Sequence, residues 1–438
     1  MFIIYNEAIE KAMREDPYIP PPDALTLTAT ADNSSVKLTK NGALSNTFEV
    51  DTGSGWTPYN LGTSITRNRG ETVKFRCVNH PTTQSGTKYI HFEMSGVFEA
   101  SGDCNSLLSP NYASIRSLNG YRYAFYKLFS DCGSLTTAPK LPATTLEVSC
   151  YAAMFSGCTA LVQAPKLPAT TLEVSCYGSM FSGCTALTQV PSLPAMELKE
   201  SCYGFMFMGC TALVQAPSAL PATTLAKDCY RRMFSGCTAL TQVPSLPAME
   251  LKRGCYESMF EGCVSLTQAP SALPAIDAPP RCYFGMFEGC TSLINAPTIA
   301  ATTCRKGSDK YDNAHFSYMF RNCTALANPP EIHLTTLAYH ALYFMFSGCT
   351  SIIRAPRLPA MTLEEGCYYG MFSGCSSLTE ASIAATTTAT DALTDWLDGV
   401  SASGTVYADP SLTLPTDSAS GIPSGWARHD IASFSTIE

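Results

Sequence analysis

The sequence predicts an α/β repeat solenoid with a parallel sheet and short helices, preceded by a small all-β, sandwich-like domain. One motif, C-Y-x-x-M-F-x-G-C, recurs at a nearly fixed period, and alternating hydrophobic and polar residues fill the stretch before it. Periods of about 20–50 residues are typical of solenoids, because a short unit cannot bury a core alone but stacked units can. The motif phenylalanines are spaced by 26, 26, 26, 27, 26, 27, 33, 26 and 26 residues: Phe129, Phe155, Phe181, Phe207, Phe234, Phe260, Phe287, Phe320, Phe346 and Phe372.

The composition excludes several classes of protein. Of the 438 residues, 45% are hydrophobic and 15% are charged, which is too apolar for a disordered chain. The net charge is −8 and basic residues do not cluster, so we expect no nucleic-acid partner. No run of about 18 apolar residues occurs, so we expect no membrane insertion. Acidic residues follow the short apolar start directly, which predicts that no signal peptide is present.

Residues 1–23 are expected to form an N-terminal tether that binds another protein. The prolines at 17 and 20–22 would keep its second half extended. A frayed tail without a function is the alternative. The candidate anchor residues are apolar and would share one face of a short helix: Phe2, Ile3, Ile4, Tyr5 and Ile9.

Residues 24–112 predict the β domain. Strand-like alternation occurs at 25–29, 35–38, 47–50 and 71–76, and turn residues separate these stretches. We expect this domain to cap the first coil, because an open solenoid end exposes both core and strand edge.

Residues 113–390 hold the ten repeat units. Cys150, Met154 and Cys158 have the i, i+4, i+8 spacing of one helical face, which predicts a short helix closed by Gly157. The stretches 161–165 and 167–172 are predicted to be extended. Neighbouring coils about 4.8 Å apart would then align their strands in one parallel sheet.

Most of the twenty cysteines fall into two columns of the repeat. The second column also contains Ala124, His315 and Ala341, and the spacing within a unit is C-x7-C rather than C-x2-C. We therefore expect small buried side chains stacked from coil to coil in a chain folded in a reducing cytoplasm, with no metal and no cofactor. Disulfides between coils and a metal site are the alternatives.

The string A-M-F-S-G-C-T-A-L resembles the A-F-x-x-C-x-x-L core of BspA-type leucine-rich repeats. Its longer, proline-rich form resembles a variant found in bacterial surface proteins and bacteriophage proteins. The resemblance implies a right-handed leucine-rich solenoid used for adhesion and recognition, and it does not imply an enzyme. It also extends to residues 55–76 of the β domain and to residues 391–438. The latter are expected to form a C-terminal cap in which Trp396 and Trp426 cover the last coil.

Three features are candidates for a recognition surface. The first is a column of strand residues whose amides could bond to each other or to sugar hydroxyls: Gln163, Gln189, Gln215, Gln242, Gln268, Asn295 and Arg354. The second is a set of aromatic residues after Cys-Tyr, which could either face outward or pack on neighbouring coils: Tyr126, Phe205, Phe284, Tyr318, Tyr343 and Tyr369. The third is the insertion in the 33-residue unit, which is either a binding loop or an idle one: Arg305, Lys306, Asp309, Lys310 and Tyr311.

Together these features favour a non-enzymatic recognition protein. The expected partners are a host surface protein or glycan and a virion protein bound through the N-terminal arm. A homo-oligomer is a further possibility, although no heptad repeat in the sequence specifies one. The expected setting is a bacteriophage virion appendage, such as a tail or head fibre. A secreted bacterial adhesin and a purely structural decoration protein are the alternatives.

Overall fold

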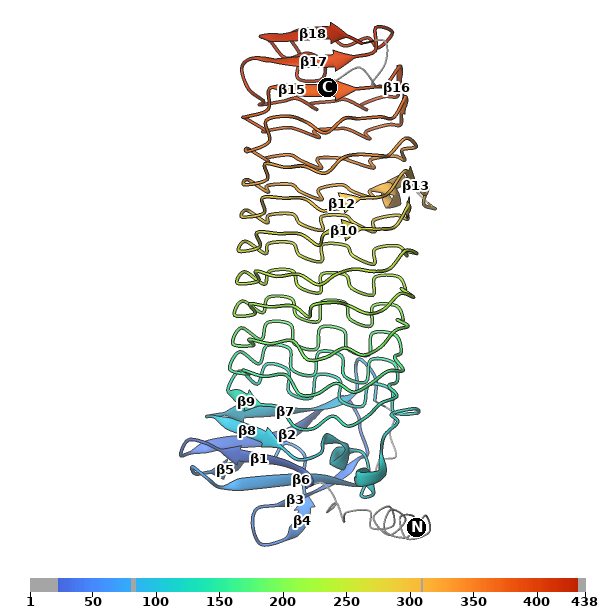
Figure 1. Ribbon diagram of the computed structural model, residues 1–438. Helices are drawn as coiled ribbons and strands as arrows, with labels where there is room; N and C mark the ends of the chain where they lie inside the picture. Colours follow the sequence, from blue (N-terminus) through green and yellow to red (C-terminus); the bar gives the residue numbers. More distant parts are fainter. Residues whose placement is uncertain (1–22, 80–83, 309, 432–438) are drawn as a thin grey trace, which may run out of the picture.

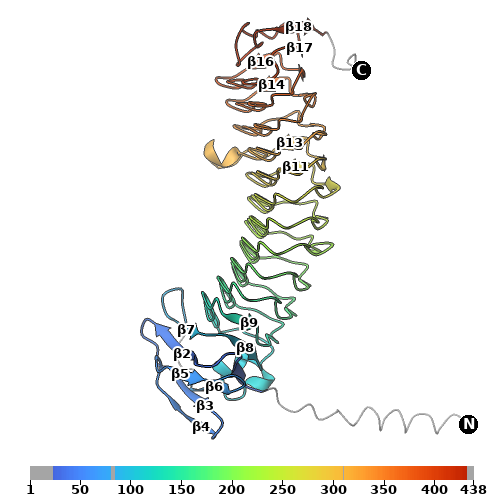
Figure 2. The same cartoon turned by 90° about the vertical axis from the view of Figure 1, so that its left-hand side faces the viewer.

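A computed structural model describes residues 23–79, 84–308 and 310–431. The predicted anchor residues, from Phe2 to Ile9, lie outside the described residues, and so does Asp309. A β domain stands at one end, and flat coils are stacked on it up to the C-terminal end (Figure 1). Seen from the side, the column of coils is narrow and curved (Figure 2). The predicted solenoid and the β domain that precedes it are both present.

Two antiparallel sheets build the β domain. The first is β4-β3-β6-β1-β8, and the second is β5-β2-β7. The strands are β1 (Leu25–Ala29), β2 (Ser34–Asn41), β3 (Thr47–Asp51), β4 (Trp56–Tyr59), β5 (Ile65–Arg67), β6 (Thr72–Asn79), β7 (Tyr89–Ser95) and β8 (Phe98–Ser101). Burial alternates along β2 and β6, as expected for strands with one face on a core. Phe75 stacks edge-on against Phe92 in this core.

The β domain is continuous with the solenoid. β9 (Leu135–Thr137), which belongs to the first repeat unit, extends the first sheet by pairing in parallel with β8. The Phe92 ring stacks on the Phe129 ring with centroids 5.0 Å apart. Two short 3-10 helices, η1 (Cys104–Leu107) and η2 (Tyr112–Ser114), lie between the last strand and the repeats. The sheet and core of the domain thus cover the edge that the first coil would otherwise expose.

The predicted short helices are wrong. No α-helix occurs in the described residues, and the C-Y-x-x-M-F-x-G-C segment is a ribbon of successive β-turns. Met154 N–H donates to the Tyr151 carbonyl within the turn at 3.2 Å, whereas Phe155 N–H donates to the Met180 carbonyl of the next coil at 2.9 Å. Alternate amides therefore bond within one coil and between coils. An α-helix would direct all of them along its own axis.

The backbone geometry explains why the spacing resembled a helix. In the second repeat unit, φ is positive at Ser149, Ala153 and Gly157, which is every fourth residue. A new turn begins every two residues, and turns with a positive φ at their third residue alternate with turns that have none. The backbone of the ribbon therefore repeats every four residues. Side chains four apart then share one face, as they nearly do in a helix of 3.6 residues per turn. Cys150, Met154 and Cys158 are indeed buried together.

The predicted single long parallel sheet is reduced to short pieces. Between coils, the strand column forms isolated parallel bridges such as Gln163–Gln189 and Gln189–Gln215. Two-residue parallel pairs also link coils: β10 (Ala272–Leu273) with β12 (Thr298–Ile299), β11 (Asp277–Ala278) with β13 (Thr303–Cys304), and β14 (Thr362–Leu363) with β16 (Thr387–Thr388). Proline lies two residues after the bridging residue in most units and removes a backbone donor, which ends each ladder early.

Like side chains stack on like through the core. The Phe155 and Phe181 rings are 5.6 Å apart and nearly parallel, and the Tyr177 and Tyr203 rings are 5.7 Å apart. All twenty cysteines are free and buried, which confirms that these columns are interior.

The coil geometry runs past residue 390. Trp396 takes the place of the motif methionine, because its carbonyl accepts from Phe372 N–H at 2.9 Å. Beyond it, β15 (Glu380–Ile383), β17 (Gly404–Ala408) and β18 (Trp426–Asp430) form a parallel sheet. Trp396 is fully buried and its ring stacks edge-on against Phe372, while Trp426 is 8% exposed. The C-terminal segment therefore adds further coil-like layers to the stack and then forms its end.

Candidate recognition surface

The predicted amide column lies on the surface of the solenoid. Gln163, Gln189, Gln215, Gln242 and Gln268 are all exposed, as are Asn295 and Arg354. Backbone bridges hold most of the amide residues opposite their equivalents in the next coil. The amide groups therefore form a row with one group per coil.

Side-chain hydrogen bonds within this column are few among the described residues. Asn328 Nδ2 donates to Asn295 Oδ1 at 2.7 Å. Among the described residues, no comparable side-chain bond joins the five glutamines to each other. One interpretation of this column was a ladder in which every amide bonds to the next. Among the described residues, such a bond is present at the pair Asn295 and Asn328 and not between the glutamines.

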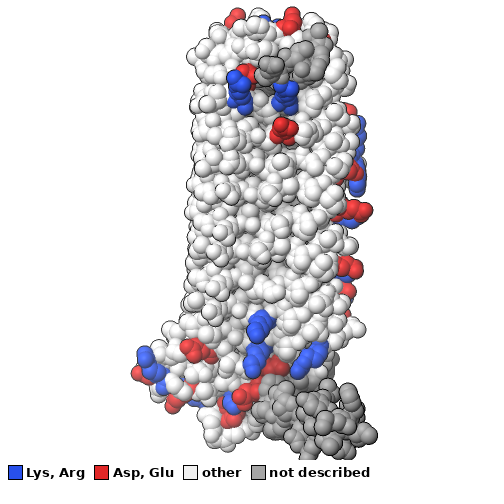
Figure 3. All heavy atoms as spheres, in the orientation of Figure 1, with Lys and Arg blue, Asp and Glu red and all other residues white. Residues whose placement is uncertain are grey.

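The surface around the glutamines carries little charge. Figure 3 shows charged side chains near the β domain, near the C-terminal end and along one edge, with a mostly uncharged surface between them. The sequence explains this distribution, because the segments 185–196, 211–226, 238–249 and 264–276 contain no Asp, Glu, Lys or Arg. The column becomes charged only towards its end, where Arg354 Nε lies 3.5 Å from Glu380 Oε2.

Shallow hollows lie between successive coils on this surface. One is lined by residues 188–190 of one unit and 214–217 of the next, including Gln189 and Gln215. Another is lined by residues 295–299, 328–331 and 333. Both hollows are open to solvent on one side.

The predicted aromatic residues lie in the turn ribbon, away from the amide column, and are half-buried. Phe284 packs edge-on against Tyr318 and lies 4.0 Å from the Arg281 guanidinium, while Arg231 lies over Phe205 at 5.6 Å. Tyr343 stacks on Tyr369 with centroids 5.0 Å apart, and Tyr126 packs edge-on against Tyr89. These rings therefore pack on neighbouring parts of the chain while one part of each stays accessible. Both predicted alternatives, an outward-facing ring and a packed ring, are thus partly correct.

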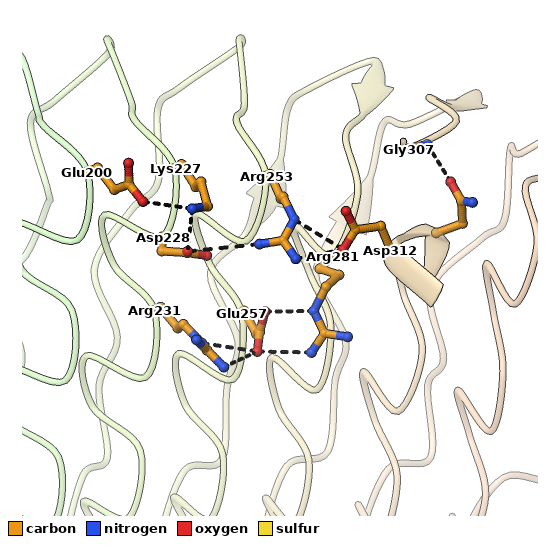
Figure 4. Close-up of polar contacts among 10 residues, drawn as sticks. Glu200, Lys227, Asp228, Arg231, Arg253, Glu257, Arg281, Gly307 and Asp312 are labelled. Carbon is orange, nitrogen blue, oxygen red and sulfur yellow. Dashed lines mark hydrogen bonds and ion pairs between the residues drawn. The ribbon is translucent and has the colours of Figure 1, made fainter. Parts of the chain in front are cut away.

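A charged network beside these rings was not predicted. Glu257 is 2% exposed, and its carboxylate accepts from Arg231 Nε at 3.1 Å and from Arg281 Nε at 3.0 Å (Figure 4). Arg231 and Glu257 occupy the same motif position in successive units, so an alignment of the units was the signal that could have revealed the pair. The network ties three coils together.

The insertion is fixed to the solenoid by ion pairs. Arg253 Nη2 lies 2.6 Å from Asp312 Oδ1, and Lys306 Nζ lies 3.0 Å from Glu364 Oε1. Arg305 pairs with Asp277. The 3-10 helix η3 (Lys310–Asn313) closes the insertion, but the side chains of Lys310 and Tyr311 lie outside the description.

His315 fills a cysteine position directly after the insertion. Its Nε2 lies 2.8 Å from the Arg305 carbonyl and its Nδ1 contacts the Asn313 carbonyl, so one buried ring joins the two ends of the loop. Burial lowers the pKa of His315, and the two carbonyl contacts oppose that effect. The histidine thus has a structural role in the loop.

The cysteines have a structural environment rather than a reactive one. Burial raises the pKa of Cys184 to about 12, and burial likewise raises the pKa of Cys210 well above its usual range. Reactive thiols need a lowered pKa and access to solvent. Within residues 23–79, 84–308 and 310–431, no cluster of three or more His, Cys, Asp or Glu side chains is arranged to hold a metal. In the same part of the chain, no helix has the length and apolar content needed to cross a membrane.

No protein-family model matches this chain, and no curated protein matches its sequence. One solved structure that does match is a leucine-rich cell surface protein from Faecalibacterium prausnitzii A2-165. It shares 15% sequence identity over 82% of this chain and 88% of that chain, with a TM-score of 0.28. At this TM-score the likeness carries no argument about fold or function. The relation to BspA-type repeats therefore stays a resemblance in the motif.

Proposed function

We propose that this chain is a non-enzymatic recognition protein whose ten sequence repeats present a row of amides to a partner on a cell surface. The observation that carries the proposal is the column of exposed glutamines from Gln163 to Gln268, of which Gln163 to Gln242 are held in register by backbone bridges, on a surface with little charge. Exposed amides both donate and accept hydrogen bonds, which suits a glycan or a polar protein surface. The half-buried aromatic residues of the turn ribbon, from Tyr126 to Tyr369, would offer a second contact area.

The rigidity of the scaffold supports this proposal. The buried ring columns and the bonds between coils fix the spacing of the glutamines before any partner arrives. A preformed row loses little conformational entropy on binding, so weak contacts repeated along the row can add up. The glutamines also lie on the side of the column, which leaves the β-domain end free for attachment.

We further propose that the setting is a bacteriophage virion, where the chain would serve as a tail or head fibre. Twenty buried free thiols suit a protein that folds in a reducing cytoplasm. In this proposal, residues 1–23 bind another virion protein and residues 24–112 separate that junction from the repeats. A secreted adhesin of the BspA type and a structural decoration protein without a ligand remain the competing proposals.

Binding of the purified full chain to host cells tests the recognition role. A triple variant, Gln189→Lys, Gln215→Lys and Gln242→Lys, places positive charge in the amide row and should weaken binding by about tenfold or more. The matched control places three lysines on the exposed β-domain loop, as Asn60→Lys, Thr63→Lys and Ser64→Lys, and should bind as the unmodified chain does. Equal weakening by both variants would contradict the amide row as the contact. Mass spectrometry of purified particles tests the virion setting, which is excluded if the chain is absent from them.

A further inference from the structure

The exposed residue before the glutamine alternates between valine and threonine over four successive units, and the alternation ends at the fifth, Thr267-Gln-Ala269. Successive units read Val162-Gln-Ala164, Thr188-Gln-Val190, Val214-Gln-Ala216 and Thr241-Gln-Val243. The buried columns do not alternate in this way, since the motif Phe and the Cys after its Gly are the same in each of these units. The half-buried residue after the glutamine does alternate between alanine and valine and packs against the core, as Ala164 and Val190 show. Coil packing therefore accounts for the pattern at that position, but not at the exposed position before the glutamine.

The alternating positions are accessible to a partner. Val162 is 46% exposed and Val214 is 45% exposed, and Thr188 and Thr241 are exposed as well. Backbone bonds keep these residues in line, because Thr188 N–H donates to the Val162 carbonyl at 3.3 Å and Thr241 N–H donates to the Val214 carbonyl at 3.0 Å. The surface thus offers one amide per coil, at a spacing of about 4.8 Å. The side chain beside the amide carries methyl groups in one coil and a hydroxyl group in the next.

One of the shallow hollows spans a full period of this pattern. Its lining contains Thr188 and Gln189 from one coil and Val214 and Gln215 from the next. The charge-free segments of the sequence lie in the same units. A partner seated there would meet amides, a hydroxyl and aliphatic carbon, and almost no charge.

We infer that this surface binds a neutral, extended, β-linked polysaccharide laid along the solenoid axis, with one sugar per coil and one disaccharide per pair of coils. This inference rests on the recognition role proposed above. In an extended β-linked chain each sugar advances by a distance close to one coil spacing, and successive sugars are turned by about half a revolution. The edge that carries the C2 and C3 substituents and the edge that carries the hydroxymethyl group therefore alternate along each side of the polymer with a period of two sugars.

The alternating flanks fit such a polymer in one register. The constant glutamines bond to hydroxyl groups that recur at every sugar. Threonine in one coil receives the edge with the C2 and C3 substituents, and valine in the next coil receives the CH2 group of the hydroxymethyl edge. Each contact is weak alone, so affinity depends on the number of coils engaged.

The experiment measures binding of the full chain to insoluble cellulose and chitin, with amylose as the helical, α-linked comparison. Soluble oligosaccharides of the two β-linked polymers, from the dimer to the hexamer, give the dependence of affinity on length. We expect binding to at least one β-linked polymer, tighter binding with each added disaccharide, and no comparable binding to amylose. Binding to none of these β-linked probes, or equal binding to amylose, overturns the inference.

Two variants test the register directly. Exchanging Thr188→Val with Val214→Thr keeps the composition but breaks the alternation, and should weaken binding by about tenfold. Adding Val162→Thr and Thr241→Val restores the alternation with the opposite phase, and should bring affinity back to within about twofold. A merely structural effect of the substitutions would grow with their number instead. If host cells bind the chain but neither polymer does, the recognition role stands and the polysaccharide is wrong; if host cells do not bind it, the recognition role itself fails.

Discussion

The Cys158 thiol donates a hydrogen bond of 3.0 Å to the backbone carbonyl oxygen of Phe129, which lies one coil earlier. The same relation recurs along the stack, for example from Cys184 to Phe155 and from Cys210 to Phe181, both at 3.1 Å. Each of these carbonyls also accepts the backbone N–H of the cysteine in its own coil. The thiol therefore bridges two coils while filling a small buried space, and this role explains the cysteine better than redox chemistry does.

Replacing one of these thiols should loosen the joint between two coils. Cys184→Ala removes the contact with Phe155 and leaves a small void, so we expect a loss of about 1–2 kcal/mol in the free energy of unfolding. The urea midpoint of the full chain reports the change. Ser218→Ala, at an exposed position, is the control and should leave the midpoint in place. An unchanged midpoint for Cys184→Ala would mean that the thiol column adds nothing to the cohesion of the coils.

The same burial should make the protein labile to alkali. Because burial raises the pKa of thiols such as Cys184, the folded chain keeps protons that the unfolded chain releases above a pKa of about 8.5. The stabilising effect is fully present below that pH and is lost as the pH rises towards the folded pKa. Each thiol contributes at most about 1.4 kcal/mol per pH unit, and all twenty cysteines are buried.

We therefore expect the urea midpoint to fall steeply from about pH 8 to about pH 10. Below that range the thiols are protonated in both the folded and the unfolded chain, so they should not change the midpoint with pH. Urea titrations monitored by circular dichroism at several pH values provide the measurement. A midpoint that stays level over this interval would show that the thiols titrate normally and are not interior.

The left-handed backbone positions of the turn ribbon give a third prediction. Ala153 has a φ of 53°, which costs an L-residue about 1–2 kcal/mol but costs glycine little. We expect Ala153→Gly to raise the free energy of unfolding by about 0.5–1 kcal/mol after the entropy cost of glycine is included. Ala160→Gly, at a position where φ is not positive, should lower it by a similar amount. Thermal unfolding of the two variants checks the opposite signs, and equal signs would contradict the turn ribbon.

Ala153 also lies in the segment whose backbone conformation was not predicted correctly from the sequence. The stacking of like residues, their burial and the β domain followed from the period and the alternation of hydrophobic residues. The backbone of the motif did not, because a four-residue turn repeat and a 3.6-residue helix place Cys150, Met154 and Cys158 on one face alike. The distinguishing signal was the residue at every fourth position, where Ser149 and Gly157 are typical of turns and unusual within a helix.

The candidate surface was predicted unevenly for a related reason. The amide column was readable because it recurs once per unit, and the structure places it in the open. Among the described residues, Glu257 is the carboxylate that pairs with arginines of both neighbouring coils, and the repeat period does not predict such a single arrangement. Recognising that Arg231 and Glu257 face each other required the register between two specific units.

Glu257 should be the most important carboxylate of the solenoid for stability. Its side chain is 3% exposed and pairs with Arg231 and Arg281, whose atoms lie 2.9 and 3.0 Å from it. Glu257→Gln keeps the shape but leaves two guanidinium groups without their counter-charge, so we expect a loss of about 1–3 kcal/mol. Because the site is shielded from solvent, the loss should persist at high salt.

Glu197 provides the matched control for this prediction, since its side chain is 65% exposed and pairs with Lys199 at 2.7 Å. Surface pairs of this kind are screened by water and salt, so Glu197→Gln should leave the urea midpoint unchanged. Equal midpoints for the two variants at low and high salt would show that burial does not strengthen the Glu257 pairs. A lower midpoint for Glu257→Gln alone would show that the buried pairs between Glu257 and its two arginines stabilise the stack and that the exposed pair does not.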